Sequence, residues 1–338
     1  MRSHAGRDVR YCSGAMNFAT QYLGLKLRSP LIVGASPFCD DVGQALQLQD
    51  AGAAALVMRS LFAEQITPPL RPDPPLNPDP TKPVPDFPEF AEYQLSPAQY
   101  LRQLHHLKKV LTIPLIVSLN GHHPGPWVDF GQQLRDAGAD AIELNFYQVV
   151  TDTTRAGDEI ESEMLRVVGQ LANAVKLPIA VKLSPYHTSI AQLAIALELE
   201  GAAGIVLFNR FYQPDIDTDE LAVQAQLRLS DPGELLLRLR WLAILSPQLR
   251  GSLAVTGGVH DCRGVVKALL AGAHAVQLVS VLLKQGPHML SALTQDLQVW
   301  MARHNFEDIE AFRGRLNLSR CSDPAAYERA NYIRILQS

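Results

Sequence analysis

The chain has 338 residues, of which 47% are hydrophobic and 19% charged, and its formal net charge is −4. This composition excludes a disordered chain, and the absence of long runs of like charge argues against a nucleic-acid-binding surface. The four cysteines form no C-x-x-C pair, so we expect a reduced, cytosolic protein without a cysteine-bound zinc or iron–sulfur site. No apolar stretch reaches the ~20 residues of a membrane-spanning helix, so no membrane partner is expected.

The first residues of the chain carry no folding pattern. They are polar and basic and lack the apolar core of a secretory signal. Met16 directly precedes the first patterned segment. We therefore expect residues 1–16 to be a disordered tail, or to lie upstream of the true start, and residues 17–338 to form a single domain.

Eight short apolar runs alternate with longer amphipathic stretches. Each run has four to six residues rich in Val, Ile, Leu and Ala, which is typical of parallel strands buried on both faces. The runs are 31–35, 54–58, 115–119, 141–146, 179–183, 204–208, 253–256 and 275–278, and the helix-period segments are 42–50, 97–111, 127–136, 159–175, 189–200, 232–245 and 262–270. Eight strand–helix units predict a closed (β/α)8 barrel, the TIM barrel of the α/β class, with a doubly wound open sheet as the alternative.

Two segments depart from this alternation. Residues 67–88 contain ten prolines among Asp and Asn, so neither a helix nor a strand can persist there. This Pro-rich loop follows the second strand, on the face where barrel active sites form, and is either a lid or pocket wall or an ordered surface loop. Residues 287–338 are expected to be helical and to contain the last barrel helix followed by a C-terminal helical extension.

Polar side chains follow several of the apolar runs, at the strand ends that form the active-site face of a barrel. They are Ser36 (after Ala35), Arg59, Ser60, Asn120, Asn145, Lys182 and Asn209. A lysine after a buried run must be paired, neutralised or aimed at a ligand, so Lys182 is either a ligand-facing cation or half of an ion pair in the barrel mouth. For Asn145 the structural alternative is a satisfied core amide.

The seventh and eighth strand ends have the features of a phosphate site. Gly257 and Gly258 would let backbone N–H groups approach an anion, and Val279 and Ser280 follow the next strand at the matching level. Barrels of this kind commonly bind phosphate between strands seven and eight, although two glycines can also simply permit a tight turn. This corner predicts a phosphorylated substrate or flavin mononucleotide (FMN).

The histidines indicate no metal site. No H-x-H or H-E-x-x-H spacing occurs, so no metal is predicted. His105 and His106 lie in an amphipathic segment and are expected on the surface, whereas His122 and His123 could face the pocket.

From Phe18 to Ser338 the sequence resembles the dihydroorotate dehydrogenase family, and most of all its divergent "dihydroorotate dehydrogenase-like" branch. The motifs that carry the resemblance are, in order, Tyr22-Leu23-Gly24-Leu25, Ser29-Pro30-Leu31, Ala35-Ser36-Pro37, Glu143-Leu144-Asn145, Val181-Lys182-Leu183-Ser184-Pro185, Thr256-Gly257-Gly258-Val259 and Gln277-Leu278-Val279-Ser280.

This resemblance implies that the barrel holds FMN at its mouth. The implied cofactor-binding residues are Ala35, Ser36, Arg59, Ser60, Asn145, Lys182, Gly257, Gly258, Val279 and Ser280. Within that set, Ala35 and Ser36 match the loop along the flavin, and Lys182 matches a lysine beside the flavin pyrimidine edge. Asn120, Asn209 and Arg210 are the implied substrate-binding residues.

The sequence departs from the family where the substrate would bind. Gln148 stands at the position of the catalytic Cys or Ser base, and an amide cannot accept a proton at physiological pH. Val149-Val150 stands where the family has Pro-Asn after that base, and the Pro-rich loop stands where the family has an asparagine-rich loop. Arg59 takes the place of a lysine, and Arg210 takes the place of a serine. Arg59 and Arg210 could instead hold an anionic substrate by bidentate contacts.

Three functions are consistent with these residues. The first is an FMN-dependent oxidoreductase that transfers hydride at a CH–CH bond of a small anionic substrate, with Lys182, Asn145 and Gln148 at the catalytic positions. The second is a genuine dihydroorotate dehydrogenase of pyrimidine biosynthesis in which Tyr147, Asp152 or a water replaces the base. The third is a phosphate-binding lyase or aldolase with Lys182 as a Schiff-base amine.

A non-enzymatic flavin-binding protein is a further alternative. The family resemblance also implies that subunits can pair as a homodimer and leaves room for an electron-transfer partner.

Overall fold

The computed structural model describes residues 16–66, 95–121, 127–210, 212–224 and 227–337. Residues 1–15 of the expected tail therefore lie outside the described residues. The Pro-rich loop over 67–88 also lies outside them, as do His122 and His123.

Eight parallel strands close into a barrel in the order β11-β12-β3-β4-β5-β6-β7-β8. They are β3 (Leu31–Val33), β4 (Leu56–Phe62), β5 (Leu115–Asn120), β6 (Ala141–Asn145), β7 (Ile179–Leu183), β8 (Gly204–Leu207), β11 (Ser252–Thr256) and β12 (Ala275–Leu278). The predicted TIM barrel is confirmed, and an open sheet is excluded. The second barrel strand extends further than its apolar run because β4 continues to Phe62 after a register shift between Val57 and Ser60.

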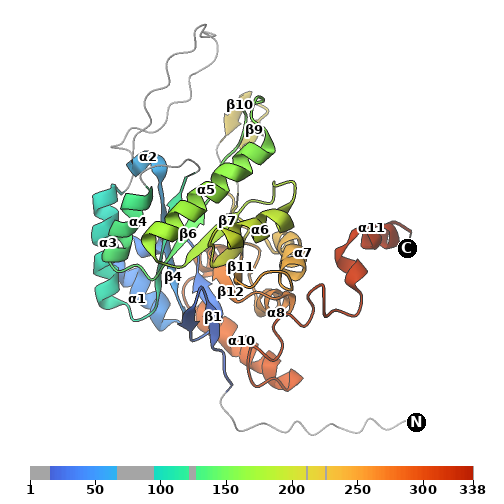
Figure 1. The fold of residues 1–338 in the computed structure, drawn as a ribbon. Coiled ribbons are helices and arrows are strands. Elements are labelled where there is room, and N and C mark those ends of the chain that lie inside the picture. Colours follow the sequence, from blue (N-terminus) through green and yellow to red (C-terminus); the bar gives the residue numbers. More distant parts are fainter. Residues whose placement is uncertain (1–15, 67–94, 122–126, 211, 225–226, 338) are drawn as a thin grey trace, which may run out of the picture.

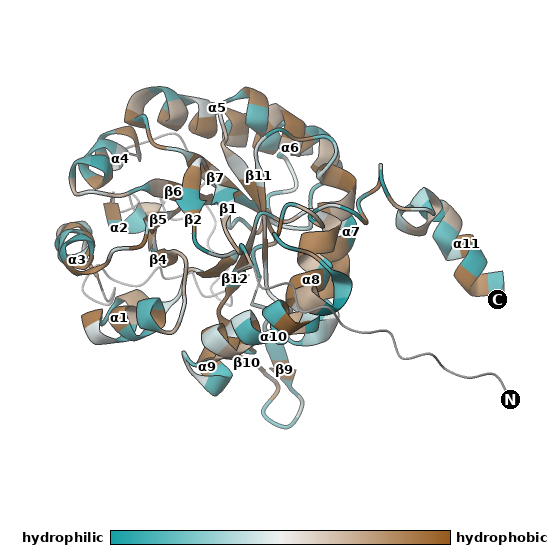
Figure 2. Ribbon diagram, turned by 90° about the horizontal axis from the view of Figure 1, so that it is seen from below, coloured by the Kyte–Doolittle hydropathy of each residue, from teal (hydrophilic) through white to brown (hydrophobic). Residues whose placement is uncertain are grey.

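Helices surround this barrel (Figures 1 and 2). They are α1 (Val42–Asp50), α2 (Ala63–Ile66), α3 (Pro97–Val110), α4 (Trp127–Asp136), α5 (Gly157–Val175), α6 (Ile190–Leu199), α7 (Leu235–Leu245), α8 (Cys262–Ala271), α9 (Ser280–Gln285) and α10 (Met289–His304), whereas α11 (Arg329–Gln337) stands apart from them. Side chains cap several of them: Asp41 accepts from Gln44 N, and Ser96 forms a capping box with Gln99 ahead of α3.

Four glycines turn helix ends into the next strand, as their position in the sequence predicts. Gly52, Gly138, Gly201 and Gly272 have φ angles of 117°, 102°, 105° and 119°. L-residues with a Cβ rarely adopt this left-handed backbone, so glycine is the residue that allows so short a connection.

The barrel interior is lined by every second residue of each strand. In β6, Ala141, Glu143 and Asn145 face inward, whereas Ile142 and Leu144 pack outward against the helices. Alanines on several strands leave space at the amino-terminal end of the barrel. Tyr22 and Leu27 fill that space from a hairpin, β1 (Thr20–Tyr22) and β2 (Leu25–Leu27), which crosses the middle of the barrel in Figure 2.

The expected C-terminal helical extension is present, as α10 and α11, but the chain between these two helices is largely not helical. After α10 the chain leaves the helix at Asn305, whose φ is 56°. It then runs along the barrel, and its backbone bonds to the ends of other helices: Gly314 N donates to Leu269 O, and Leu318 N donates to Ala243 O. These tertiary hydrogen bonds replace helical ones. A 3-10 helix at Pro324–Tyr327 then leads into α11, which projects from the barrel (Figure 1).

Candidate active site

A cavity of about 550 Å³ opens at the carboxyl ends of the barrel strands, a volume typical of small-molecule sites. Most of the residues predicted from the strand ends line it, namely Ala35, Ser36, Ser60, Asn120, Asn145, Lys182, Asn209, Arg210, Gly257, Val279 and Ser280. Three predicted residues do not: Gly258, Gln148 and Arg59 lie outside this lining. Arg59 lines an adjoining cavity of about 470 Å³.

Strand register explains why the polar residues meet. Asn120 pairs with Asn145 across β5 and β6, and Asn145 pairs with Lys182 across β6 and β7. The three side chains therefore lie on adjacent strands at one level of the barrel and form part of the cavity floor. Each of the three is at most 8% exposed.

Asn145 has one half of its amide satisfied by protein and one half without a partner. Its Nδ2 donates to Ser60 Oγ at 3.1 Å and to Ser118 Oγ at 2.9 Å. Its Oδ1 is buried and accepts no hydrogen bond from the described residues. A buried acceptor without a partner costs free energy, so this oxygen is suited to a ligand N–H or O–H in the cavity.

Lys182 is paired inside the barrel. Its Nζ donates to Glu143 Oε1 at 3.1 Å. Glu143 is fully buried, and its other oxygen accepts from Gln277 Nε2. Lys182 therefore lies in an ion pair and also lines the cavity, so the two roles that its position in the sequence suggested are compatible.

The glycine corner has the backbone expected for close approach. Gly257 and Gly258 have φ angles of 83° and 80°. Gly258 N donates to Ser230 Oγ at 3.2 Å, and Ser230 N donates to Ser280 Oγ at 3.0 Å. Ser230 Oγ also lies 3.2 Å from His260 Nε2. Burial lowers the pKa of His260, and the nearby positive charge of Lys284 lowers it further.

Positive charge lies directly behind this corner. The Arg238 guanidinium is buried, and a Cβ on Gly257 would stand 2.9 Å from its Nη2. Arg238 pairs with Glu234, and Arg210 Nε donates to the same carboxylate at 3.1 Å to each oxygen. Two arginines share one glutamate, so this cluster brings a net positive charge to the cavity wall.

The two arginines predicted to bind an anionic substrate both have protein partners. Arg59 Nη2 pairs with Asp40, and Arg210 Nε pairs with Glu234. Some of the guanidinium N–H donors that would bind a substrate anion are therefore already occupied by protein carboxylates.

Several site residues were not identified from the sequence. They are Ser118, Glu143, Ser230, Glu234, Arg238 and Gln277. Glu143 and Gln277 belong to the motifs quoted above, and their polar character inside buried apolar runs was the available signal.

The outer wall of the cavity is aromatic and aliphatic. Phe62, Tyr147, Phe208, Tyr212, Leu227 and Leu229 line it. A polar floor beneath an apolar wall can orient a ring-shaped ligand and keep water from it.

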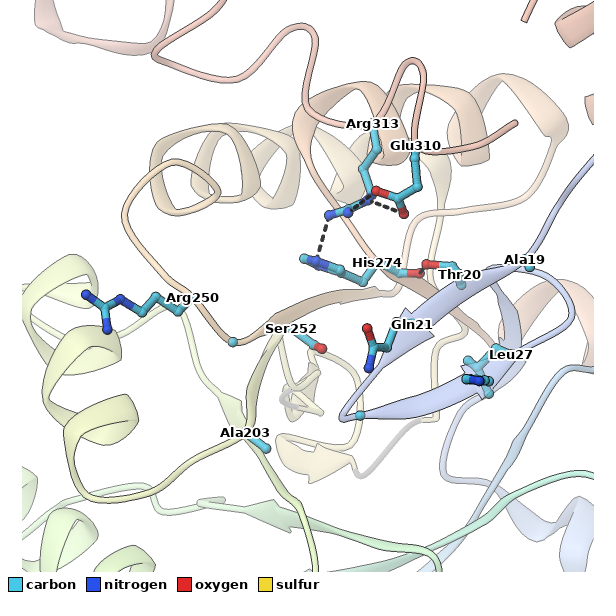
Figure 3. A pocket seen from close by; sticks show the side chains of 13 residues that line it. Ala19, Thr20, Gln21, Leu27, Ala203, Arg250, Ser252, His274, Glu310 and Arg313 are labelled. Atoms are coloured by element: carbon cyan, nitrogen blue, oxygen red, sulfur yellow. Dashed lines mark hydrogen bonds and ion pairs between the residues drawn. The ribbon is translucent and has the colours of Figure 1, made fainter. Parts of the chain in front are cut away.

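A second cavity, of about 560 Å³, lies at the opposite end of the barrel beside the β1–β2 hairpin (Figure 3). Its polar groups bond to one another. Arg313 Nη1 lies 2.6 Å from His274 Nε2, and Arg313 Nη2 pairs with Glu310. Leu253 N donates to His274 Nδ1 at 3.0 Å. These contacts support a structural role for this end of the barrel.

His274 is expected to make the protein sensitive to acid. Burial, followed by the positive charge of Arg313, lowers the pKa of His274 to about 4. The unfolded chain binds this proton below about pH 6.5, so the stabilisation is complete above that pH and is lost as pH falls toward 4. The loss should be about 3 kcal/mol in the free energy of unfolding. Urea unfolding at pH 7 and pH 4.5 should show a smaller difference for His274→Gln than for the wild type. Equal differences would contradict this assignment.

The described residues contain neither a metal cluster nor a membrane span. No three His, Cys, Asp or Glu side chains among them gather as metal ligands. None of their helices is long and apolar enough to cross a bilayer.

A closed parallel barrel with a cavity at its strand ends and a glycine corner between β11 and β12 defines a TIM-barrel protein. The family model for dihydroorotate dehydrogenase matches residues 97–301. The chain belongs to the dihydroorotate dehydrogenase family.

Relatives are similar at low identity over most of the chain. The NAD(+)-dependent dihydroorotate dehydrogenase B catalytic subunit of Thermoplasma volcanium is 24% identical over 312 residues, which cover 88% of this chain and 98% of that protein. The corresponding subunit of Methanothermobacter thermautotrophicus is 26% identical over 304 residues, or 87% of this chain and 97% of that protein. The NAD-dependent dihydropyrimidine dehydrogenase subunit PreA of Escherichia coli is 24% identical over 218 residues, or 60% and 53%.

Proposed function

We propose that this protein is an FMN-dependent oxidoreductase that transfers hydride at a CH–CH bond of a small anionic substrate. The observation that carries this proposal is the cavity itself, which joins the glycine corner at Gly257 to a polar floor containing Asn145 and Lys182. Relatives named as dihydroorotate and dihydropyrimidine dehydrogenases support an oxidoreductase.

The residues present fit FMN. Asn145 Oδ1 is a buried acceptor without a partner among the described residues, and Asn145 lines the cavity. The corner around Gly257, Ser230 and Ser280 offers backbone and hydroxyl groups suited to a phosphate, with the buried Arg238 behind it. When bound, FMN would supply the site that accepts or donates hydride.

The remaining chemistry belongs to side chains of this chain. Lys182 places an ammonium group at the cavity floor, where it would stabilise negative charge. The aromatic wall formed by Phe62, Phe208 and Tyr212 would exclude water and hold a ring against the floor. The Arg210–Glu234–Arg238 cluster would attract an anionic substituent through its net charge.

Proton transfer needs a group other than Gln148. Gln148 is an amide and does not line the cavity. Asp152 is exposed, and hydrogen bonds from Thr154 lower its pKa, which weakens it as a base. Tyr147 does line the cavity, and its hydroxyl accepts from Tyr212 N at 3.3 Å. We assign to Tyr147 the role of holding or releasing a proton at its hydroxyl oxygen.

The alternative functions have less support. A Schiff-base lyase requires a neutral lysine, whereas Lys182 lies in an ion pair with Glu143. A genuine dihydroorotate dehydrogenase would have to work without the usual base and with Val150 in place of an asparagine. Because two relatives are named as catalytic subunits, an electron-transfer subunit is part of the proposal. The pairing of two copies of this chain stays a prediction from the family resemblance.

The purified protein is expected to be yellow and to release about one FMN per chain on heating. Chromatography of the released flavin against FMN, FAD and riboflavin identifies it. Borohydride treatment with carbonyl compounds, followed by mass spectrometry, tests the lyase alternative in the same preparation. A colourless protein that does not bind added FMN would contradict the proposed function.

A further inference from the structure

A chain of polar side chains runs through the barrel interior beneath the cavity floor. Lys182 Nζ donates to Glu143 Oε1 at 3.1 Å, and Gln277 Nε2 donates to Glu143 Oε2. Tyr22 approaches from the hairpin at the other end of the barrel. Burial raises the pKa of Tyr22 well above its usual value, and the negative charge of Glu143 raises it further.

These groups are shielded from solvent. Glu143 and Tyr22 are 0% exposed, Gln277 is 1% and Lys182 is 6% exposed. A carboxylate in such surroundings persists only when it is paired and hydrogen-bonded. Both oxygens of Glu143 have partners, one charged and one neutral.

The placement of the chain follows from strand alternation. Glu143 lies two residues before Asn145 on β6, so both face the interior at successive levels. Gln277 faces inward from β12 in the same way. The pair is therefore built into the barrel wall directly below the cavity floor.

We propose that Glu143, held by Gln277, is a positioning residue that orients Lys182 and balances its charge at the floor of the site. This inference rests on the proposed function, because the charge it concerns would face the flavin. Because the charges of Lys182 and Glu143 cancel, Lys182 could donate a hydrogen bond to the flavin edge while the pair adds little net positive charge there. Glu143 thereby sets how strongly the site favours the reduced, anionic flavin.

A double-mutant cycle, in which each of the two charges is removed singly and then both together, tests this inference. Glu143→Gln removes one negative charge at constant shape, so the midpoint potential of bound FMN should rise. Lys182→Met removes the positive charge and should lower that potential. The double variant Glu143→Gln/Lys182→Met has no net charge at this position, so its potential should lie between those of the two single variants. Tyr22→Phe is the matched control, because it removes a neighbouring hydroxyl without altering charge, and only a small shift is expected.

The unfolding temperatures of the flavin-free proteins provide a second readout. Each single variant leaves one buried charge without its partner, whereas the double variant removes both. The double variant should therefore unfold at a higher temperature than Lys182→Met. This comparison remains valid if Glu143→Gln alone fails to fold.

The two proposals fail in distinguishable ways. Absence of FMN from the wild type would contradict the proposed function, and the unfolding cycle would then test the charge pair by itself. The inference is overturned if Glu143→Gln binds FMN with an unchanged potential. It is likewise overturned if Lys182→Met and the double variant unfold at the same temperature.

Discussion

Replacing Ser280 by aspartate is expected to weaken FMN binding about 1,000-fold, while Ser280→Asn should stay within about tenfold of the wild type. Ser280 lines the cavity at the glycine corner, and its Oγ accepts from Ser230 N at 3.0 Å. A carboxylate about 4 Å from a phosphate charge costs about 4 kcal/mol at an effective dielectric constant of about 20. Aspartate and asparagine have the same shape, and both can accept from Ser230 N, so their difference isolates charge.

Ser280 is a better position for this test than the glycines. A Cβ on Gly258 would lie 2.5 Å from Leu235 N, and its φ of 80° is strained for any other residue. A substitution at Gly258 would therefore disturb the backbone even if no phosphate binds at this corner. Affinity is measured by titrating FMN into flavin-free protein and following flavin fluorescence. Equal dissociation constants for the Asp and Asn variants would place the phosphate elsewhere.

Dihydroorotate is expected to reduce the bound flavin about 10²–10⁴-fold more slowly than it does in relatives with a Cys or Ser base, since a positioned base typically contributes that factor. Gln148 has no useful basicity and does not line the cavity. Val150 stands where the family has an asparagine that would contact the substrate, and the Val150 side chain is exposed. Anaerobic stopped-flow absorbance measures the rate, with the Methanothermobacter thermautotrophicus subunit as the side-by-side comparison.

Gln148→Cys should recover little of this rate, because the new thiol would stand outside the cavity lining and the substrate contacts would still be missing. Tyr147→Phe is the informative partner variant. If wild-type protein reduces at a rate comparable to the relative, the substrate assignment is wrong. Loss of that rate in Tyr147→Phe would then identify Tyr147 as the substitute base.

Local pattern in the sequence was sufficient for the barrel and for much of the cavity lining. Apolar runs separated by helix-period segments predict alternating strands and helices, and a closed parallel barrel brings all strand ends to one face. Asn145, Lys182 and Ser280 could therefore be assigned to that face before their contacts were known, and all three line the cavity. The glycines at helix ends were equally predictable, because a left-handed residue is a local requirement.

The partners of those residues were decided by the tertiary structure. Lys182 and Glu143 are 39 positions apart, and Gln277 and Glu143 are 134 apart. Ser230 meets Ser280 across 50 positions because a loop after β8 folds over the glycine corner. Periodicity reports which face a residue occupies but not which distant side chain it meets, since that depends on strand register and loop path.

The same distinction explains two local differences between the expectation and the structure. Gln148 follows β6 in sequence, but the chain turns there so that Tyr147, and not Gln148, lines the cavity. The segment after α10 was expected to be helical, yet its backbone bonds to the ends of α7 and α8. The sequence by itself therefore determined the barrel and the residue types at its mouth, because these depend on local pattern. The tertiary structure alone decided the charge pairing and the contacts of the site, because these depend on groups that only the closed barrel brings together.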